Sequence, residues 1–145
     1  STDPFPYVYD LIEKVQKQLQ CKVVIHDGNL LDCTKRGFLT TSTIQNIGPL
    51  EFLSLIKNAN FVITSSFHGT AFAINYRKSF FSIVDKRKTD DRIESLLTKL
   101  ELTERLIPIG TSISSLENFN INYTKTEAKL NENIRYSVNY LKSNL

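Results

Sequence analysis

Five residues suited to binding an anion fall within six consecutive positions: Ser65, Ser66, His68, Gly69 and Thr70. They follow the apolar run "FVIT" and precede "AFAIN", so they stand where a buried strand meets a helix. The first N–H groups of a helix are unpaired and its dipole is positive there, which together favour an anion. Hydroxyls and a histidine add hydrogen-bond donors, and the glycine lets the backbone approach a ligand. The turn is therefore predicted to bind an anionic ligand.

The same residues also have a purely structural interpretation. Serine is a common helix N-cap, and Gly69 is equally suited to close packing of a helix against a strand. A nucleophilic Ser–His pair is disfavoured, because no G-x-S-x-G motif surrounds the serines and no acidic partner for His68 is evident. An anion site and a capped structural turn are the two interpretations that remain open.

A second group of polar residues, "VDKRKTDDR" at positions 84–92, follows the next predicted strand. Lys86 and Lys88 are expected to be solvated. Arg92 stands in the first turn of a helix, where a cation opposes the helix dipole. We therefore expect its guanidinium to meet an anion. His26 also ends a strand, but a lone histidine in a loop is expected to be incidental.

The surrounding sequence predicts alternating helices and strands. The hydrophobic spacing predicts helices over residues 4–20, 48–60, 69–78, 90–100 and 124–145. Short runs rich in Val, Ile and Phe predict strands over residues 21–26, 61–64 and 80–84. This alternation indicates one α/β domain over residues 1–145, with a parallel sheet and helices on both faces. Ligands bind beyond the carboxyl ends of such strands, so both polar groups are predicted at one sheet edge. The loop at 110–123 is the most loosely specified segment.

Composition excludes several classes of protein. The net charge of +3 suits a small anionic ligand. The sequence has no basic stripe with interleaved aromatic residues, which is the pattern that would predict nucleic-acid binding. The longest apolar runs fall far short of the ~20 residues of a membrane span, so no span is expected, and the opening residues do not predict a secretory leader. A cytoplasmic protein is expected, either free or at the inner face of the membrane. Cys21 and Cys33 lack metal-ligand spacing, so we expect no metal site and a reduced pair, with a disulfide as the alternative.

Two separated motifs together resemble one protein family. "NANFVITSSFHGTAFAINYRKSFFSI", followed by "DRIESLLTKLELTERLI", closely resembles the C-terminal half of the polysaccharide pyruvyl transferase family. The family pattern is a V-[IV]-[ST]-x-S/R-[FLY]-H-G turn and a downstream Arg-x-x-S-L-L helix. The resemblance implies a Rossmann-like half of a two-domain, glycosyltransferase-B-like enzyme. It implies transfer of the pyruvyl group of phosphoenolpyruvate onto two sugar hydroxyls, which forms a ketal on a surface or capsular polysaccharide.

The resemblance also implies roles for the motif residues. His68 would contact phosphoenolpyruvate as an acid or a phosphate ligand. The donor phosphate would lie against Ser65, Ser66, Gly69, Thr70 and Arg92. The donor is a substrate, so no cofactor is expected. This sequence has Ser66 where some relatives carry an arginine, so that position supplies a hydroxyl and no positive charge.

The partners that this resemblance implies are phosphoenolpyruvate, a glycan or lipid-linked oligosaccharide acceptor, and an N-terminal domain that this sequence lacks. The chain contains no methionine, which also suggests part of a longer protein. We expect the chain to fold alone, to bind the donor weakly, and to be inactive by itself. Two alternatives remain: a nucleotide-sugar glycosyltransferase half, with Asp85 as the residue holding a ribose, or a non-catalytic anion-binding module.

Overall fold

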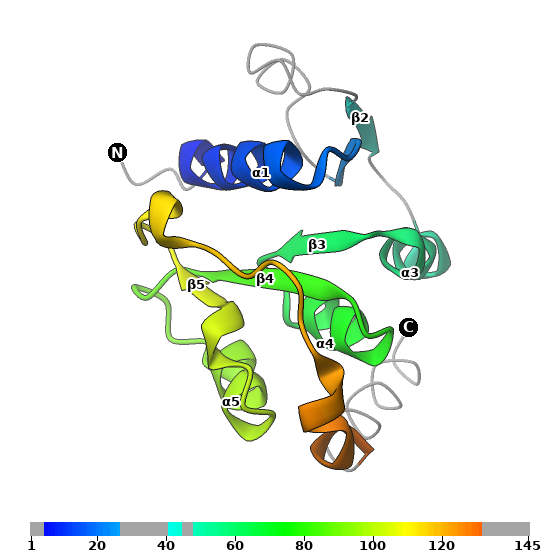
Figure 1. The fold of residues 1–145 in the computed structure, drawn as a ribbon, viewed down its shortest axis with the longest axis vertical. Coiled ribbons are helices and arrows are strands. Elements are labelled where there is room, and N and C mark those ends of the chain that lie inside the picture. Colours follow the sequence, from blue (N-terminus) through cyan, green and yellow to red (C-terminus); the bar gives the residue numbers. More distant parts are fainter. Residues whose placement is uncertain (1–4, 27–40, 45–47, 132–145) are drawn as a thin grey trace. The chain divides into compact units, whose positions relative to one another are not determined.

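The computed structural model describes residues 5–26, 41–44 and 48–131 (Figure 1). The chain divides into two compact units, Ser1–Gly48 with Ser112–Leu116, and Pro49–Thr111 with Glu117–Leu145. All of the predicted site residues belong to the second unit. Cys33 and most of the predicted C-terminal helix lie outside the described residues.

The first unit combines one long helix with a pair of parallel strands. Its elements are α1 (Phe5–Leu19), β1 (Val23–His26), β2 (Thr41–Ile44) and the 3-10 helix η2 (Ile113–Ser115). Strand β1 pairs in parallel with β2, with Val23 opposite Thr41. Lys14 Nζ donates a hydrogen bond to the Ile113 carbonyl oxygen, 2.7 Å away. The helix and β1 confirm the sequence prediction, whereas β2 was not predicted because "TSTI" lacks an apolar run.

The second unit is built on three parallel strands in the order β3-β4-β5. The strands are β3 (Phe61–Thr64), β4 (Ser79–Val84) and β5 (Leu106–Pro108). The helices are α3 (Pro49–Asn58), α4 (Phe67–Asn75) and α5 (Arg92–Lys99), with the 3-10 helices η1 (Thr103–Arg105) and η3 (Tyr123–Thr126). The predicted α/β class with a parallel sheet is thereby confirmed.

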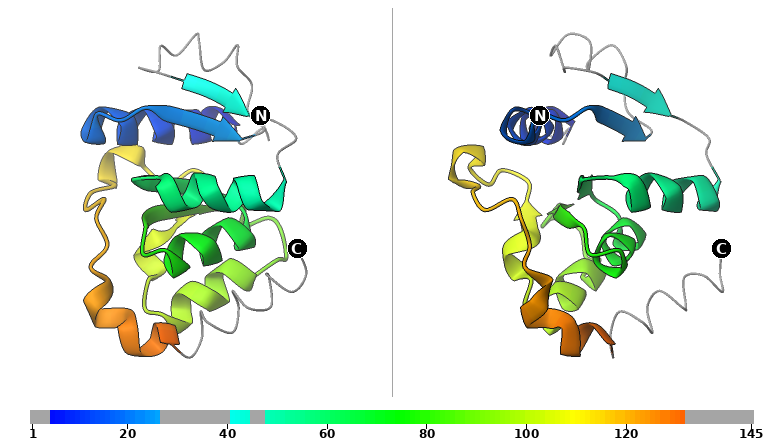
Figure 2. Two further views of the ribbon diagram at one scale, coloured as in Figure 1. Left: turned by 90° about the vertical axis from the view of Figure 1, so that its right-hand side faces the viewer. Right: turned by 45° about the vertical axis from the view of Figure 1, so that its right-hand side comes forward.

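Helices α4 and α5 cover the same face of this sheet. Helix α4 connects β3 to β4 and α5 connects β4 to β5, so both connections step across the sheet in the same direction. Because such connections between parallel strands are right-handed, both helices lie on the same face of the sheet. Figure 2 shows α4 lying between α3 and α5. The core on this face packs Phe72 and Ile74 of α4 with Phe80 of β4 and Leu97 of α5, all at most 1% exposed. The apolar run of β4 is buried on both faces, as expected for a central parallel strand.

The opposite face of the sheet is covered by aromatic rings and a buried cation. Phe61 and Phe81 each contact the ring of Phe119 edge-on, at 6.0 Å and 5.8 Å between centroids. The Arg105 guanidinium carbon lies 5.5 Å from the centroid of the Phe81 ring. Its Nη1 donates to the carbonyl of Phe119 (3.1 Å), and its Nη2 donates to the carbonyls of Asn118 (2.7 Å) and Asn120 (3.1 Å). The segment expected to be loosely specified is therefore held at these residues by Arg105.

Candidate functional site

The turn from β3 to α4 contains most of the predicted site residues. Ser66 is the N-cap of α4, with φ −104° and ψ 138°, and its Oγ accepts the Gly69 N–H at 3.1 Å. Its own N–H donates to Thr64 Oγ1, 3.1 Å away. Ser66 thus ties the end of the strand to the first turn of the helix, which is the capping role that serine favours. Both Ser65 and Ser66 are exposed beside this cap.

Gly69 is required here by close packing. A Cβ at this position would lie 2.3 Å from Thr64 Oγ1 and 3.1 Å from Thr64 Cβ. A side chain at this position would require either Thr64 or the start of α4 to shift. The glycine therefore allows α4 to begin directly against the end of β3, and the structure supports its packing role.

Thr70 points into the protein, where its hydroxyl already has partners. The residue is 0% exposed, and its Oγ1 donates to the Ser66 carbonyl at 2.9 Å. The same atom lies 2.7 Å from the hydroxyl of Ser82 on β4, which is also 0% exposed. Thr70 consequently does not present its hydroxyl to a ligand in this arrangement.

His68 is exposed at the first turn of α4. Its backbone N–H and that of Phe67 have no intrahelical acceptor, since they belong to the first turn. Within the part of the chain that the structure describes, no hydrogen bond satisfies either group. His68 therefore belongs to a helical turn with two open N–H donors at the positive end of the helix dipole, and such a turn is suited to an anion.

Arg92 reaches the same turn from the next helix. Its guanidinium carbon lies 5.1 Å from the centroid of the Phe67 ring, and that ring is 6.1 Å from the His68 ring. The β4–α5 connection thus brings Arg92 to Phe67, next to His68 in the chain, although 24 positions separate the arginine from the histidine. Phe67 was not among the predicted site residues, because its contact with a cation depends on the tertiary packing of α4 and α5.

Asp90 holds Arg92 in this position. Arg92 Nε donates to both carboxylate oxygens, at 3.1 Å and 3.2 Å, and Nη2 donates to Oδ2 at 2.9 Å. The Asp90 carboxylate also accepts the Arg92 backbone N–H at 3.1 Å, which offsets the unfavourable position of a cation in the first turn. The side-chain hydrogen bonds from Arg92 in turn lower the pKa of Asp90. Nη1 of Arg92 makes no hydrogen bond to the described residues.

Asp85 has a similar pairing that weakens its candidacy as a ribose ligand. Arg87 donates to its two carboxylate oxygens at 2.9 Å and 2.8 Å. These side-chain hydrogen bonds, together with one from the Arg87 backbone at 3.0 Å, lower the pKa of Asp85 to about 2. The carboxylate is thus already occupied, and a nucleotide-sugar site gains no support from it.

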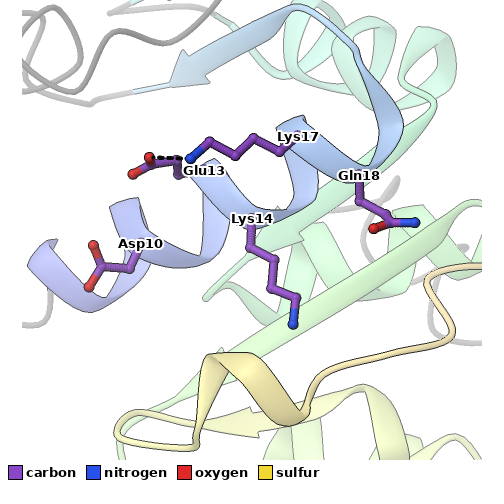
Figure 3. A pocket seen from close by; sticks show the side chains of 5 residues that line it. All are labelled: Asp10, Glu13, Lys14, Lys17 and Gln18. Carbon is purple, nitrogen blue, oxygen red and sulfur yellow. Dashed lines mark ion pairs between the residues drawn. The ribbon is translucent and has the colours of Figure 1, made fainter.

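A surface hollow along α1 contains none of the predicted site residues. It is lined by Asp10, Glu13, Lys14, Lys17 and Gln18, all from that helix (Figure 3). Glu13 and Lys17 form an ion pair at 3.0 Å within it, one helical turn apart. Among the described residues, no group of three or more potential metal ligands is present, and no helix is long and apolar enough to span a membrane.

Comparison with known proteins gives one family match. A family model described as polysaccharide pyruvyl transferase matches residues 5–87, which is more than half of the chain. The matched range contains the whole turn from β3 to α4 and ends before Arg92. No curated protein and no solved structure matches the chain.

Proposed function

The chain belongs to the polysaccharide pyruvyl transferase family, and from this premise we propose that it binds phosphoenolpyruvate for transfer of the pyruvyl group to a glycan. The acceptor is a surface or capsular polysaccharide or its lipid-linked precursor. Two hydroxyls of one sugar become the two oxygens of a ketal. A second α/β domain, N-terminal to this one, supplies the acceptor surface.

The reaction balances without a cofactor. The C2 carbon of phosphoenolpyruvate gains bonds to two hydroxyl oxygens, while its bond to the phosphate oxygen breaks and its double bond to the methylene carbon becomes a single bond. One hydroxyl proton ends on the methylene carbon, which becomes a methyl group. The other leaves with the phosphate as hydrogen phosphate. The enzyme must therefore hold a phosphate and a carboxylate, and must move protons near C2.

The observation that carries this proposal is the position of His68. His68 is exposed in the first turn of α4, which carries the open N–H groups, and the Phe67 ring contacts both the His68 ring and the guanidinium of Arg92. We assign the phosphate to the helix N-terminus with Ser65 and Ser66, and the proton transfer to His68. Arg92 faces the donor with Nη1. Gly69 and Thr70 shape the turn from inside.

Direct binding tests the donor assignment. Phosphoenolpyruvate titrated into the protein should perturb the His68 imidazole resonances in an NMR spectrum, and acceptor-dependent phosphate release should require the second domain. A uridine diphosphate sugar is the comparison ligand. If it binds at His68 and phosphoenolpyruvate does not, the glycosyltransferase alternative replaces this proposal. Phosphate release by this chain alone with a galactose- or mannose-bearing acceptor would remove the need for a second domain.

Arg92→Lys should weaken phosphoenolpyruvate binding by about tenfold, because lysine keeps the charge but loses the planar fork. Arg87→Lys is a matched control: both arginines pair with an aspartate two positions earlier, but Arg92 also lies over Phe67. The control should leave donor affinity nearly unchanged. Isothermal titration calorimetry on both variants makes the comparison, and equal affinities would return Arg92 to a solvated surface role.

A further inference from the structure

We propose that Ser82 is a positioning residue for His68, acting through the buried hydroxyl of Thr70. Ser82 lies within the apolar strand β4, and Thr70 lies in the first turns of α4. Both residues are 0% exposed, and their hydroxyl oxygens are 2.7 Å apart. The contact joins the strand to the helix two positions beyond His68.

The direction of these hydrogen bonds follows from the number of protons. Thr70 has one hydroxyl proton, which it donates to the Ser66 carbonyl at 2.9 Å. The hydroxyl of Ser82 must therefore donate to Thr70 Oγ1. The Ser66 carbonyl also accepts the Thr70 backbone N–H at 3.0 Å. A directed chain of hydrogen bonds thus runs from Ser82 through Thr70 to Ser66, the N-cap that precedes Phe67 and His68.

This buried polar pair is not needed to fill the core. An alanine and a valine would occupy nearly the same space without burying two hydroxyls, whose desolvation offsets much of the gain from their hydrogen bond. The pair instead specifies how α4 packs on β4, because the two hydroxyls can satisfy each other only when the helix lies at one position along the strand. Together with the close contact of Gly69 and Thr64, it fixes where α4 begins against β3 and β4, and with it the backbone position of His68.

The importance of this positioning for catalysis rests on the proposed function, but its first test does not. The chain has two histidines, so His68→Gln assigns the His68 resonances by their disappearance. In the unliganded protein, Ser82→Ala should shift those resonances. It should also raise the dissociation constant of phosphoenolpyruvate by about three- to tenfold, the loss expected for one hydrogen bond. Thr70→Ser keeps the hydroxyl and should stay close to the parent in both measurements.

Thr126→Val is the matched control for a buried hydroxyl in the same unit. Thr126 is 5% exposed, and its Oγ1 donates to the Tyr123 carbonyl at 3.1 Å. The Tyr123 hydroxyl in turn donates to the carbonyl of Lys78, directly before β4 begins, so this control lies at the opposite end of that strand from His68. Loss of stability without any change in the His68 resonances is expected for Thr126→Val.

If Ser82→Ala also lost stability without any change in the His68 resonances, the positioning role of Ser82 would be overturned. If Ser82→Ala does not fold, Thr70→Val removes the same link from the helix side and is judged by the same resonances. A parent protein that fails to bind phosphoenolpyruvate would contradict the proposed function, while the unliganded spectra would still decide the role of Ser82.

Discussion

In the enzyme that includes the second domain, His68→Ala should lower kcat by roughly 10²–10⁴ while leaving the melting temperature unchanged, as expected for loss of a group that transfers a proton in the transition state. The structure explains why kcat should fall without a loss of stability. His68 is exposed and contributes no buried surface to the core, so its removal creates no cavity. The measurement is acceptor-dependent phosphate release, paired with thermal unfolding of the same preparation.

The outcomes separate the possible roles of the imidazole. A large rise in KM with unchanged kcat would make His68 a phosphate ligand that binds ground state and transition state equally. Near-normal turnover with unchanged melting would rule out a role in the reaction. His68→Gln refines the test, since it keeps a hydrogen-bond donor but cannot exchange a proton near neutral pH.

Local sequence was sufficient to predict the turn from β3 to α4. An apolar run that ends in two serines, followed by a histidine and a glycine, predicts the strand end, a capping serine and a helix after it, although α4 begins at Phe67, two residues before the predicted start. Each of these signals depends on neighbours in the chain, so one sequence suffices to find them. The placement of Arg92 at the same edge followed from the parallel topology alone.

The inward direction of Thr70 was not predictable in the same way. A threonine after His-Gly fits a phosphate loop and a buried helix turn equally well. Its partner Ser82 is twelve positions away on strand β4, and only the packing of α4 on β4 brings the two hydroxyls together. A serine inside the apolar run "FFSIV" was the available signal, because a buried hydroxyl requires a partner.

Long-range contacts also explain why residues 118–120 were underestimated. The segment lacks helical or strand periodicity, so its sequence indicates a loop. Its order comes from Arg105, whose guanidinium binds three successive carbonyls, and from Phe119, which packs on two rings of the sheet. Burial lowers the pKa of Arg105, which is the physical sign of a cation held inside the fold.

Arg105→Met should therefore destabilise the protein by roughly 2–4 kcal/mol, because a buried charged donor is lost and the Phe119 carbonyl is left without a partner. The methionine keeps most of the apolar stem, so the effect reports the guanidinium rather than lost volume. Only 3% of Arg105 is exposed, and water cannot readily replace its hydrogen bonds. Urea unfolding measures the change through the midpoint at constant slope.

Arg77→Met is the control for this last prediction. Arg77 also makes a fork, donating to the carboxylate oxygens of Glu127 at 2.9 Å and 3.0 Å, and it also donates to two carbonyls. Its side chain is 37% exposed, however, so water takes over these hydrogen bonds when the guanidinium is removed, and the loss should stay below about 1 kcal/mol. The two variants thus delete the same group from a buried and a solvated position. Equal losses would mean that the carbonyls at 118–120 find other partners, and that Phe119 rather than Arg105 holds this segment on the sheet.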